Sequence, residues 1–168
     1  MRRTARWTAK NRCRSNNSPT CCGQLGINRE DGRRTAPSAL NRQEIDLYLI
    51  GRKGAYRYDA EAHALVPVAE GDLRGKVNSQ EYTRTGDWIL IFVADYMRMT
   101  QGDMQGNAVT AGIDAGLIAQ NVYLYGASEG LAVVVHSTVN RAEVAKTLGL
   151  KSSQHIALGQ TVGIPARR

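Results

Sequence analysis

Short apolar runs separated by turn residues predict a chain built largely from β-strands. Residues 44–51 read as the first strand, and the alternating residues 55–59 pair with it as a hairpin through residues 52–54. Residues 88–94 form an almost unbroken apolar run, which is typical of a strand buried on both faces. Residues 131–136 predict another buried strand.

Weaker patterns add shorter pieces to this sheet. Residues 64–68 predict an edge strand, since Pro67 cannot donate a hydrogen bond to a neighbouring strand. Residues 154–162 predict the last strand, and residues 71–80 have mixed helical character.

One long helix and one short helix are expected in the second half of the chain. The long helix runs from about 108 to 128 with Asn107 as its cap, and the short one runs from 141 to 148 between Asn140 and Gly149. The long helix is apolar on nearly every side, which is typical of a buried helix.

Small side chains on the long helix would let a second helix approach closely. They are Ala111, Gly112, Ala115, Gly116 and Ala119. Packing inside the chain and packing against a second subunit are both compatible with this pattern. Met97, Met99 and Met104 precede it and could either line an apolar pocket or fill gaps in the core.

The composition fits a single domain without a membrane span. The net charge is +7 over 168 residues, but it is confined to one end. Residues 1–34 carry nine Lys and Arg side chains against two acidic ones, and residues 35–168 carry 13 of each. Because the body is neutral, a basic nucleic-acid-binding protein is disfavoured, and deleting residues 1–25 would remove any such binding.

All three cysteines, Cys13, Cys21 and Cys22, also lie near the start. Their spacing matches no zinc site, and adjacent cysteines are poorly placed for a local disulfide. We therefore expect no structural metal and no essential disulfide. The chain divides into an aberrant or disordered basic leader at 1–25 and a folded domain at 26–168. No secretory signal is visible, so the chain as given is expected in the cytoplasm, and an exported form with another start stays open.

A polar loop at residues 33–43 precedes the first strand and is the strongest candidate for ligand binding. A Pro-Ser turn at Pro37 and Ser38 cannot continue a helix, and it leaves backbone N–H groups and small polar side chains free. Loops held against a sheet edge often bind ligands, although an ordinary surface loop has the same composition.

The order Pro-Ser-x-x-Asn-x-Gln before a strand resembles the flavin-contacting loop of the nitroreductase family. Residues 114–116, 120–124 and 127–132 are similar to the central helix of that family and the turn that ends it. Residues 160–165 resemble its closing strand, with Ile164 in place of the usual Tyr.

The resemblance runs from about Gly26 to Pro165. It implies an α+β nitroreductase-like fold with a mainly antiparallel central sheet flanked by helices, and a long buried central helix at a homodimer interface. It also implies FMN as cofactor and NAD(P)H as electron donor.

The same resemblance implies which residues contact the flavin. The loop would meet the isoalloxazine ring or the ribityl chain, the turn at 129–130 would place a backbone N–H near flavin N5, and Arg167 or its neighbour would bind the phosphate. The implied cofactor-binding residues are Pro37, Ser38, Ala39, Asn41, Gln43, Glu129, Gly130, Leu131 and Arg167.

The N-terminal arginine motif and first helix of the family are not evident in residues 1–25. Reading residues 20–25 one base earlier permits Asn-Leu-Leu-Trp-Ala-Ala, which fits the apolar face of a helix. We hypothesise that the leader is an out-of-frame product. The alternative is that residues 2–7, Arg-Arg-Thr-Ala-Arg-Trp, are themselves the phosphate-binding motif.

The expected function is electron transfer from NAD(P)H to a nitroaromatic, a quinone or a similar acceptor. The sequence has no phosphate-binding P-loop, no dinucleotide fingerprint and no serine nucleophile elbow, and His136 reads as a structural histidine. We predict no catalytic side chain, because the flavin itself performs the chemistry in such enzymes. A cofactor-deficient inactive fragment and an FMN-dependent azoline-type dehydrogenase are the alternatives.

Overall fold

The computed structural model describes residues 5–6, 34–99 and 102–165. The strands are β1 (Ala5–Arg6), β2 (Ile45–Gly51), β3 (Gly54–Asp59), β4 (Ala64–Glu70), β5 (Trp88–Asp95), β6 (Ala132–His136) and β7 (Gln154–Gly163). The α-helices are α2 (Glu81–Thr85), α3 (Met104–Glu129) and α4 (Arg141–Leu148). Three short 3-10 helices are η1 (Ala39–Asn41), η2 (Arg74–Lys76) and η3 (Tyr96–Arg98).

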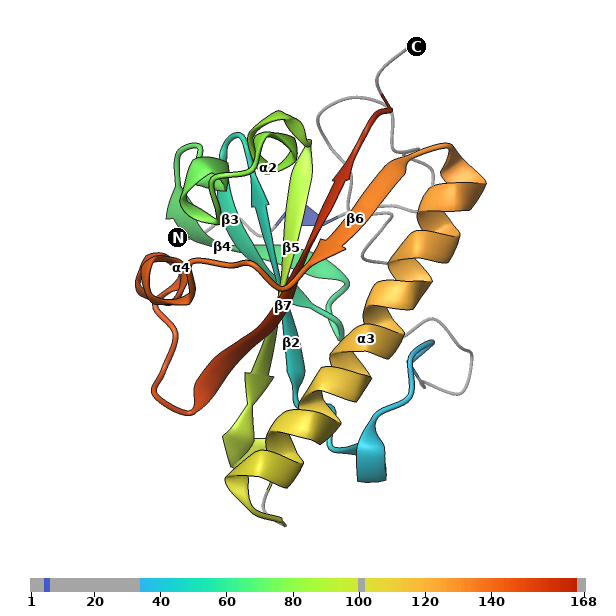
Figure 1. Cartoon of the computed structure of the whole chain (residues 1–168), viewed down its shortest axis with the longest axis vertical. Coiled ribbons are helices and arrows are strands. Elements are labelled where there is room, and N and C mark those ends of the chain that lie inside the picture. Colours follow the sequence, from blue (N-terminus) through green and yellow to red (C-terminus); the bar gives the residue numbers. More distant parts are fainter. Residues whose placement is uncertain (1–4, 7–33, 100–101, 166–168) are drawn as a thin grey trace.

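The strands form one sheet in the order β1-β4-β3-β2-β5-β7-β6. Every strand pair recorded in it is antiparallel. The long helix α3 crosses one face, and α4 lies on the opposite side of the sheet (Figure 1). This arrangement confirms the predicted α+β class with a mainly antiparallel sheet.

Alternate residues of the central strands enter two separate apolar clusters, because successive side chains of a strand point to opposite faces. Leu47 and Leu49 of β2 pack on the side of α3, whereas Tyr48 and Ile50 pack with Val144 of α4. The predicted hairpin is confirmed, with Gly51 opposite Gly54. The two-sided burial predicted for residues 88–94 is also confirmed, since residues 89–94 are all buried.

The start of α3 differs from the prediction. Asp103 caps the helix by accepting a hydrogen bond from the Gly106 N–H at 2.7 Å. Asn107 lies inside the first turns, where its side-chain amide donates to the Met99 carbonyl at 3.2 Å. The prediction of Asn107 as the cap was therefore wrong, because Asp103 offers an equally suitable cap one turn earlier.

In the single chain, α3 is buried on one side only. Ala111, Ala115, Ala119 and Val122 pack on the sheet. An added methyl group at Gly112 or Gly116 would meet no atom within 4 Å, so the two glycines face outward. The exposed apolar side chains of this helix are Met104, Val109, Ile113, Leu117 and Leu124.

Strand β6 is an edge strand, whereas the sequence predicts a strand buried on both faces. It pairs only with β7 among the described strands, and within it only His136 is buried. An apolar run of five residues has the same composition at the edge and at the centre of a sheet, which explains the error. By contrast, α4 has the predicted limits, with Asn140 as its cap and Gly149 at its end in the left-handed conformation.

Candidate functional site

The loop before β2 has an unusual backbone. Leu40, Asn41 and Gln43 all have φ near +50°, in the left-handed region that residues with a side chain rarely adopt. Each such residue costs about 1–3 kcal/mol, so the surrounding structure must hold the loop in place. Leu40 is also 76% exposed.

Hydrogen bonds hold this loop from within. The Gln43 N–H donates to the Ser38 hydroxyl at 2.7 Å, and that hydroxyl donates to the Glu44 carboxyl at 3.2 Å. The Asn41 N–H donates to the Ser38 carbonyl at 2.9 Å, and the Gln43 side chain donates to the Asn41 side chain at 3.0 Å. Ser38 is therefore the centre of the internal network.

Contacts from other elements hold the loop from outside. The Ala39 N–H donates to Oδ2 of Asp114 on α3 at 2.8 Å. Arg98 donates to the Gln43 carbonyl at 2.9 Å and forms two 3.0 Å contacts with the Asp46 carboxylate. The loop is thus joined to the long helix on one side and to the segment after β5 on the other.

Glu44 and Asp114 form a buried carboxyl pair beneath the loop. Glu44 is 0% exposed and Asp114 is 4% exposed. Burial raises the pKa of Glu44, and Asp114 raises it further through hydrogen bonding and its charge. Oε1 of Glu44 has no hydrogen-bond partner. Protonation of Glu44 would let its carboxyl group donate to Asp114, which accepts from the Ala39 N–H of the loop.

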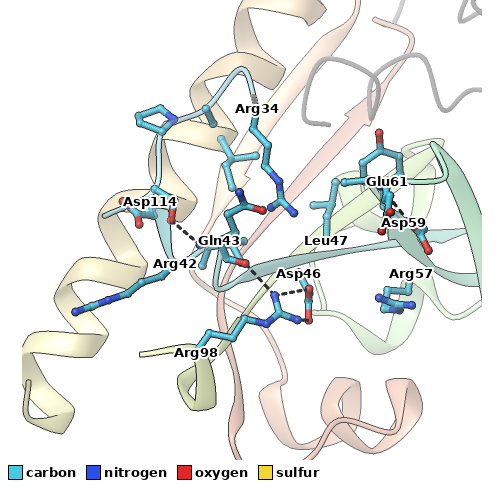
Figure 2. A pocket seen from close by; sticks show the side chains of 17 residues that line it. Arg34, Arg42, Gln43, Asp46, Leu47, Arg57, Asp59, Glu61, Arg98 and Asp114 are labelled. Atoms are coloured by element: carbon cyan, nitrogen blue, oxygen red, sulfur yellow. Dashed lines mark hydrogen bonds and ion pairs between the residues drawn. The ribbon is translucent and has the colours of Figure 1, made fainter. Parts of the chain in front are cut away.

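The loop borders a pocket of about 620 Å³, which is shown in Figure 2. Such a volume is typical of small-molecule sites. The pocket is lined by Arg34, Ala36, Pro37, Ser38, Arg42, Gln43, Ile45, Asp46, Leu47, Arg57, Tyr58, Asp59, Ala60, Glu61, Arg98, Asp114 and Ile118. Of the predicted cofactor-binding residues, Pro37, Ser38 and Gln43 therefore lie in its wall.

The second predicted group lies at the far end of α3. Gly130 ends the helix with φ +68°, which confirms the conformational reason for glycine there. An added methyl group at Gly130 would meet no atom within 4 Å, whereas one at Gly126 would collide with Val133. The N–H groups of Gly130 and Leu131 both donate to the Gly126 carbonyl. Glu129 is exposed.

One chain does not bring the two predicted groups together. Asp114 contacts the loop at Ala39, and Gly130 follows 16 positions later on the same straight helix. At a rise of 1.5 Å per residue these positions are about 24 Å apart along the helix. That distance exceeds the length of a flavin ring system. Arg167, Cys13, Cys21 and Cys22 lie outside the described part of the chain, and of the leader only residues 5–6 are described, as strand β1 paired with β4.

Several residues of the site were not predicted. Glu44 was read only as part of a strand, although an acid directly after a polar loop is a signal for a contact with that loop. Arg57 and Asp59 alternate along β3 and so share a face, which the sequence pattern also shows. Arg34 lies in the predicted loop but was not singled out, and Arg98 joins the pocket only through the tertiary fold.

Other candidate groups have structural surroundings. His136 is buried, lies 3.2 Å from the Thr161 hydroxyl, and has its pKa lowered by burial. Met99 is part of the core, and Met97 and Met104 are exposed and do not line the pocket. Among the described residues, no three His, Cys, Asp or Glu side chains gather as metal ligands. No helix within this part is long and apolar enough to cross a membrane.

The carboxyl pair predicts how stability depends on pH. The folded-state pKa of Glu44 lies above its ordinary value of 4.5, so its stabilising contribution is complete below that pH and is lost as the pH rises through the folded-state pKa. Glu44→Gln keeps an acceptor for Ser38 and a donor for Asp114 without ionising. We expect the free energy of unfolding of the variant, relative to that of the wild type, to increase by about 1 kcal/mol from acidic to mildly alkaline pH.

Urea unfolding at a series of pH values measures this difference. Glu61→Gln, at an exposed glutamate on the rim of the same pocket, is the matched control for the loss of one acidic side chain. A Glu44→Gln variant that is destabilised equally at every pH would contradict a protonated Glu44.

Comparisons with known proteins agree with this architecture. A model of the nitroreductase family matches residues 5–164. A protein of Methanocaldococcus jannaschii, provisionally named a nitroreductase, is 28% identical over 138 residues, which cover 75% of this chain and 69% of that protein. A crystal structure of a protein from Ralstonia eutropha with the same provisional name is 35% identical, with a TM-score of 0.79 over 87% of this chain and 70% of the other.

A third similar structure is the NADPH:FMN oxidoreductase of Vibrio harveyi in complex with NAD+. It is 23% identical, with a TM-score of 0.60 over 79% of this chain and 55% of the other, and supports the fold alone. The family match covers nearly the whole chain, and the Ralstonia structure is matched along most of its length at more than 30% identity. The chain therefore belongs to the nitroreductase family.

Proposed function

We propose that the chain is a flavin-dependent oxidoreductase that binds FMN and transfers electrons from NAD(P)H to a nitroaromatic, a quinone or a similar acceptor. Membership of the nitroreductase family supports a flavin oxidoreductase in general, and the similar Vibrio protein is named for NADPH and FMN. The observation that carries the proposal is the loop around Ser38, which is strained and yet fixed by contacts from three directions. Strain of this kind is concentrated at functional sites.

The residues present suit a flavin. Pro37, Ser38 and Gln43 border a pocket, and Asn41 is exposed beside them. Gly130 offers open backbone surface, against which a planar ring can lie. The Gly130 N–H already donates within the helix turn, so a bond to flavin N5 would be shared with the Gly126 carbonyl, as bifurcated bonds at helix ends commonly are.

We further propose that a second copy of the chain completes the site. The Ala39 contact at Asp114 and the Gly130 turn are about 24 Å apart along α3 in one chain. The outward face of the same helix exposes Ile113 and Leu117 beside Gly112 and Gly116, where a second helix could approach closely. A homodimer formed through this face would cover the apolar side chains and supply the missing group to each site.

Bound FMN would supply the hydride-accepting and electron-donating chemistry. The protein would hold the ring through the fixed loop and exclude water with the apolar face of α3. We assign a role in proton transfer to none of its side chains. The azoline-type dehydrogenase remains a hypothesis from the sequence alone.

A titration of the purified chain with FMN tests the proposal. We expect saturable binding with a perturbed flavin spectrum that bleaches on addition of NADH or NADPH. Ser38→Ala removes the acceptor for the Gln43 N–H and should weaken FMN binding about tenfold, while Ser79→Ala at an exposed position should not. A chain that is folded by circular dichroism and binds no FMN would instead support the inactive fragment.

Ile113→Glu tests the second copy. Ile113 is 59% exposed in the single chain, and a carboxylate there would be buried without a partner in a dimer. We expect analytical ultracentrifugation to show a dimer for the wild type and a monomer for the variant, with FMN binding lost together with the dimer. Val68→Glu on β4, at 38% exposure, is the control for an exposed apolar residue. A monomeric Ile113→Glu variant that still binds FMN would contradict the shared site.

A further inference from the structure

The pocket beside the loop contains a group of arginines that the proposed flavin contacts do not use. Arg34 lies at the start of the loop, Arg57 lies on β3, and Arg98 lies in η3 after β5. In Figure 2 the three lie around Asp46, with Arg34 above it, Arg98 below it and Arg57 to one side. Because they come from three separate segments, their meeting is a product of the tertiary fold.

Among the described residues, only one of these arginines has a carboxylate partner. Arg98 forms an ion pair with Asp46 at 3.0 Å. No ion pair among the described residues joins Arg34 or Arg57 to an acidic side chain. The Nε of Arg34 is buried without a hydrogen-bond partner, and burial lowers the pKa of Arg34, with Arg98 adding to the effect. Leaving a charged donor buried in this way is unfavourable unless an acceptor arrives.

The other acidic groups of the pocket are directed elsewhere. Oδ1 of Asp59 accepts from the N–H groups of Glu61 and Ala62 at 3.1 and 2.9 Å. Asp114 accepts from the Ala39 N–H on the opposite wall. Glu61 is exposed in the turn between β3 and β4. The pocket therefore has balanced formal charge, and within the described residues neither Arg34 nor Arg57 forms an ion pair.

We propose that this pocket binds the anionic group of a small-molecule substrate, a phosphate or a carboxylate, through the guanidinium groups of Arg34 and Arg57. Guanidinium forks match the geometry of both oxyanions. Arg98 is already paired with Asp46 and is not assigned to the anion. That the ligand is a substrate rests on the proposed function, because the pocket shares Pro37, Ser38 and Gln43 with the flavin loop.

Two sources could supply the anion, a phosphate of the nicotinamide nucleotide or a carboxylate of the electron acceptor. Isothermal titration of the full chain with two matched pairs separates them. The first pair is 2′,5′-ADP and adenosine, and the second is 4-nitrobenzoate and 4-nitrobenzyl alcohol. We expect one pair to show a clear preference for its anionic member.

The variants Arg34→Gln and Arg57→Gln should each reduce that preference about tenfold, since each removes a charged hydrogen-bond donor. Arg57→Lys keeps the charge but loses the fork, and should reduce the preference less. Arg52→Gln is the matched control. Arg52 lies at the opposite end of the β2–β3 hairpin, outside the pocket, and its ion pair with Asp87 is long at 3.9 Å.

Three results would overturn the proposal. One is equal binding of the charged and uncharged members in both pairs, and another is an Arg52→Gln variant that loses as much preference as Arg57→Gln. The third is an Arg57→Gln variant that binds FMN about tenfold more weakly but riboflavin normally, since the arginines would then hold the phosphate of the flavin. The titrations need neither flavin nor turnover, so a failure of the proposed function would remain distinguishable.

Discussion

The hydrogen bond from the Ala39 N–H to Asp114 joins positions that are 75 residues apart and fixes the loop to the long helix. Beside the nearly buried Asp114 lies Glu44, whose pKa is raised by burial and by Asp114, so protonation of Glu44 would relieve the repulsion between the two carboxyl groups. Glu44 also accepts from Ser38, the centre of the loop's own network. The contacts of these two carboxyl groups with Ser38 and Ala39 therefore help to hold backbone conformations that are costly on their own.

The same helix, α3, also separates the two groups of residues that the proposed site needs. α3 packs its alanines on the sheet and leaves Ile113, Leu117 and two glycines outside. Its middle holds the loop, and its end at Gly130 lies about 24 Å away. In the proposed dimer, the length of this helix is the reason that two chains are needed. A shorter helix would bring both groups into one chain and leave the apolar face without a role.

Local signals in the sequence predicted the elements that local chemistry determines. The hairpin, the limits of α4 and the glycine at the end of α3 depend on turn and cap residues within a few positions. The order of residues in the loop identified the family before the fold was known. The cap of α3 was missed because Asp103 and Asn107 are equally good candidates from sequence.

Features that depend on the arrangement of distant segments were not predicted. β6 was misread because an apolar run does not show whether a strand has one neighbour or two. The arginines at 34, 57 and 98 meet only after β2, β3 and β5 are paired. The raised pKa of Glu44 likewise depends on burial and on Asp114 beside it, and no spacing rule connects those positions.

A mixed dimer tests the central claim most directly. Ser38→Leu would disrupt the loop, and Gly130→Val would place a branched side chain at a left-handed turn, so each homodimer should lose FMN. If each site takes its loop from one chain and its turn from the other, the mixed dimer has one intact site. We predict that mixed dimers, purified through two different tags, bind about half as much FMN as the wild type. A mixed dimer that binds no more FMN than its parents would contradict the account.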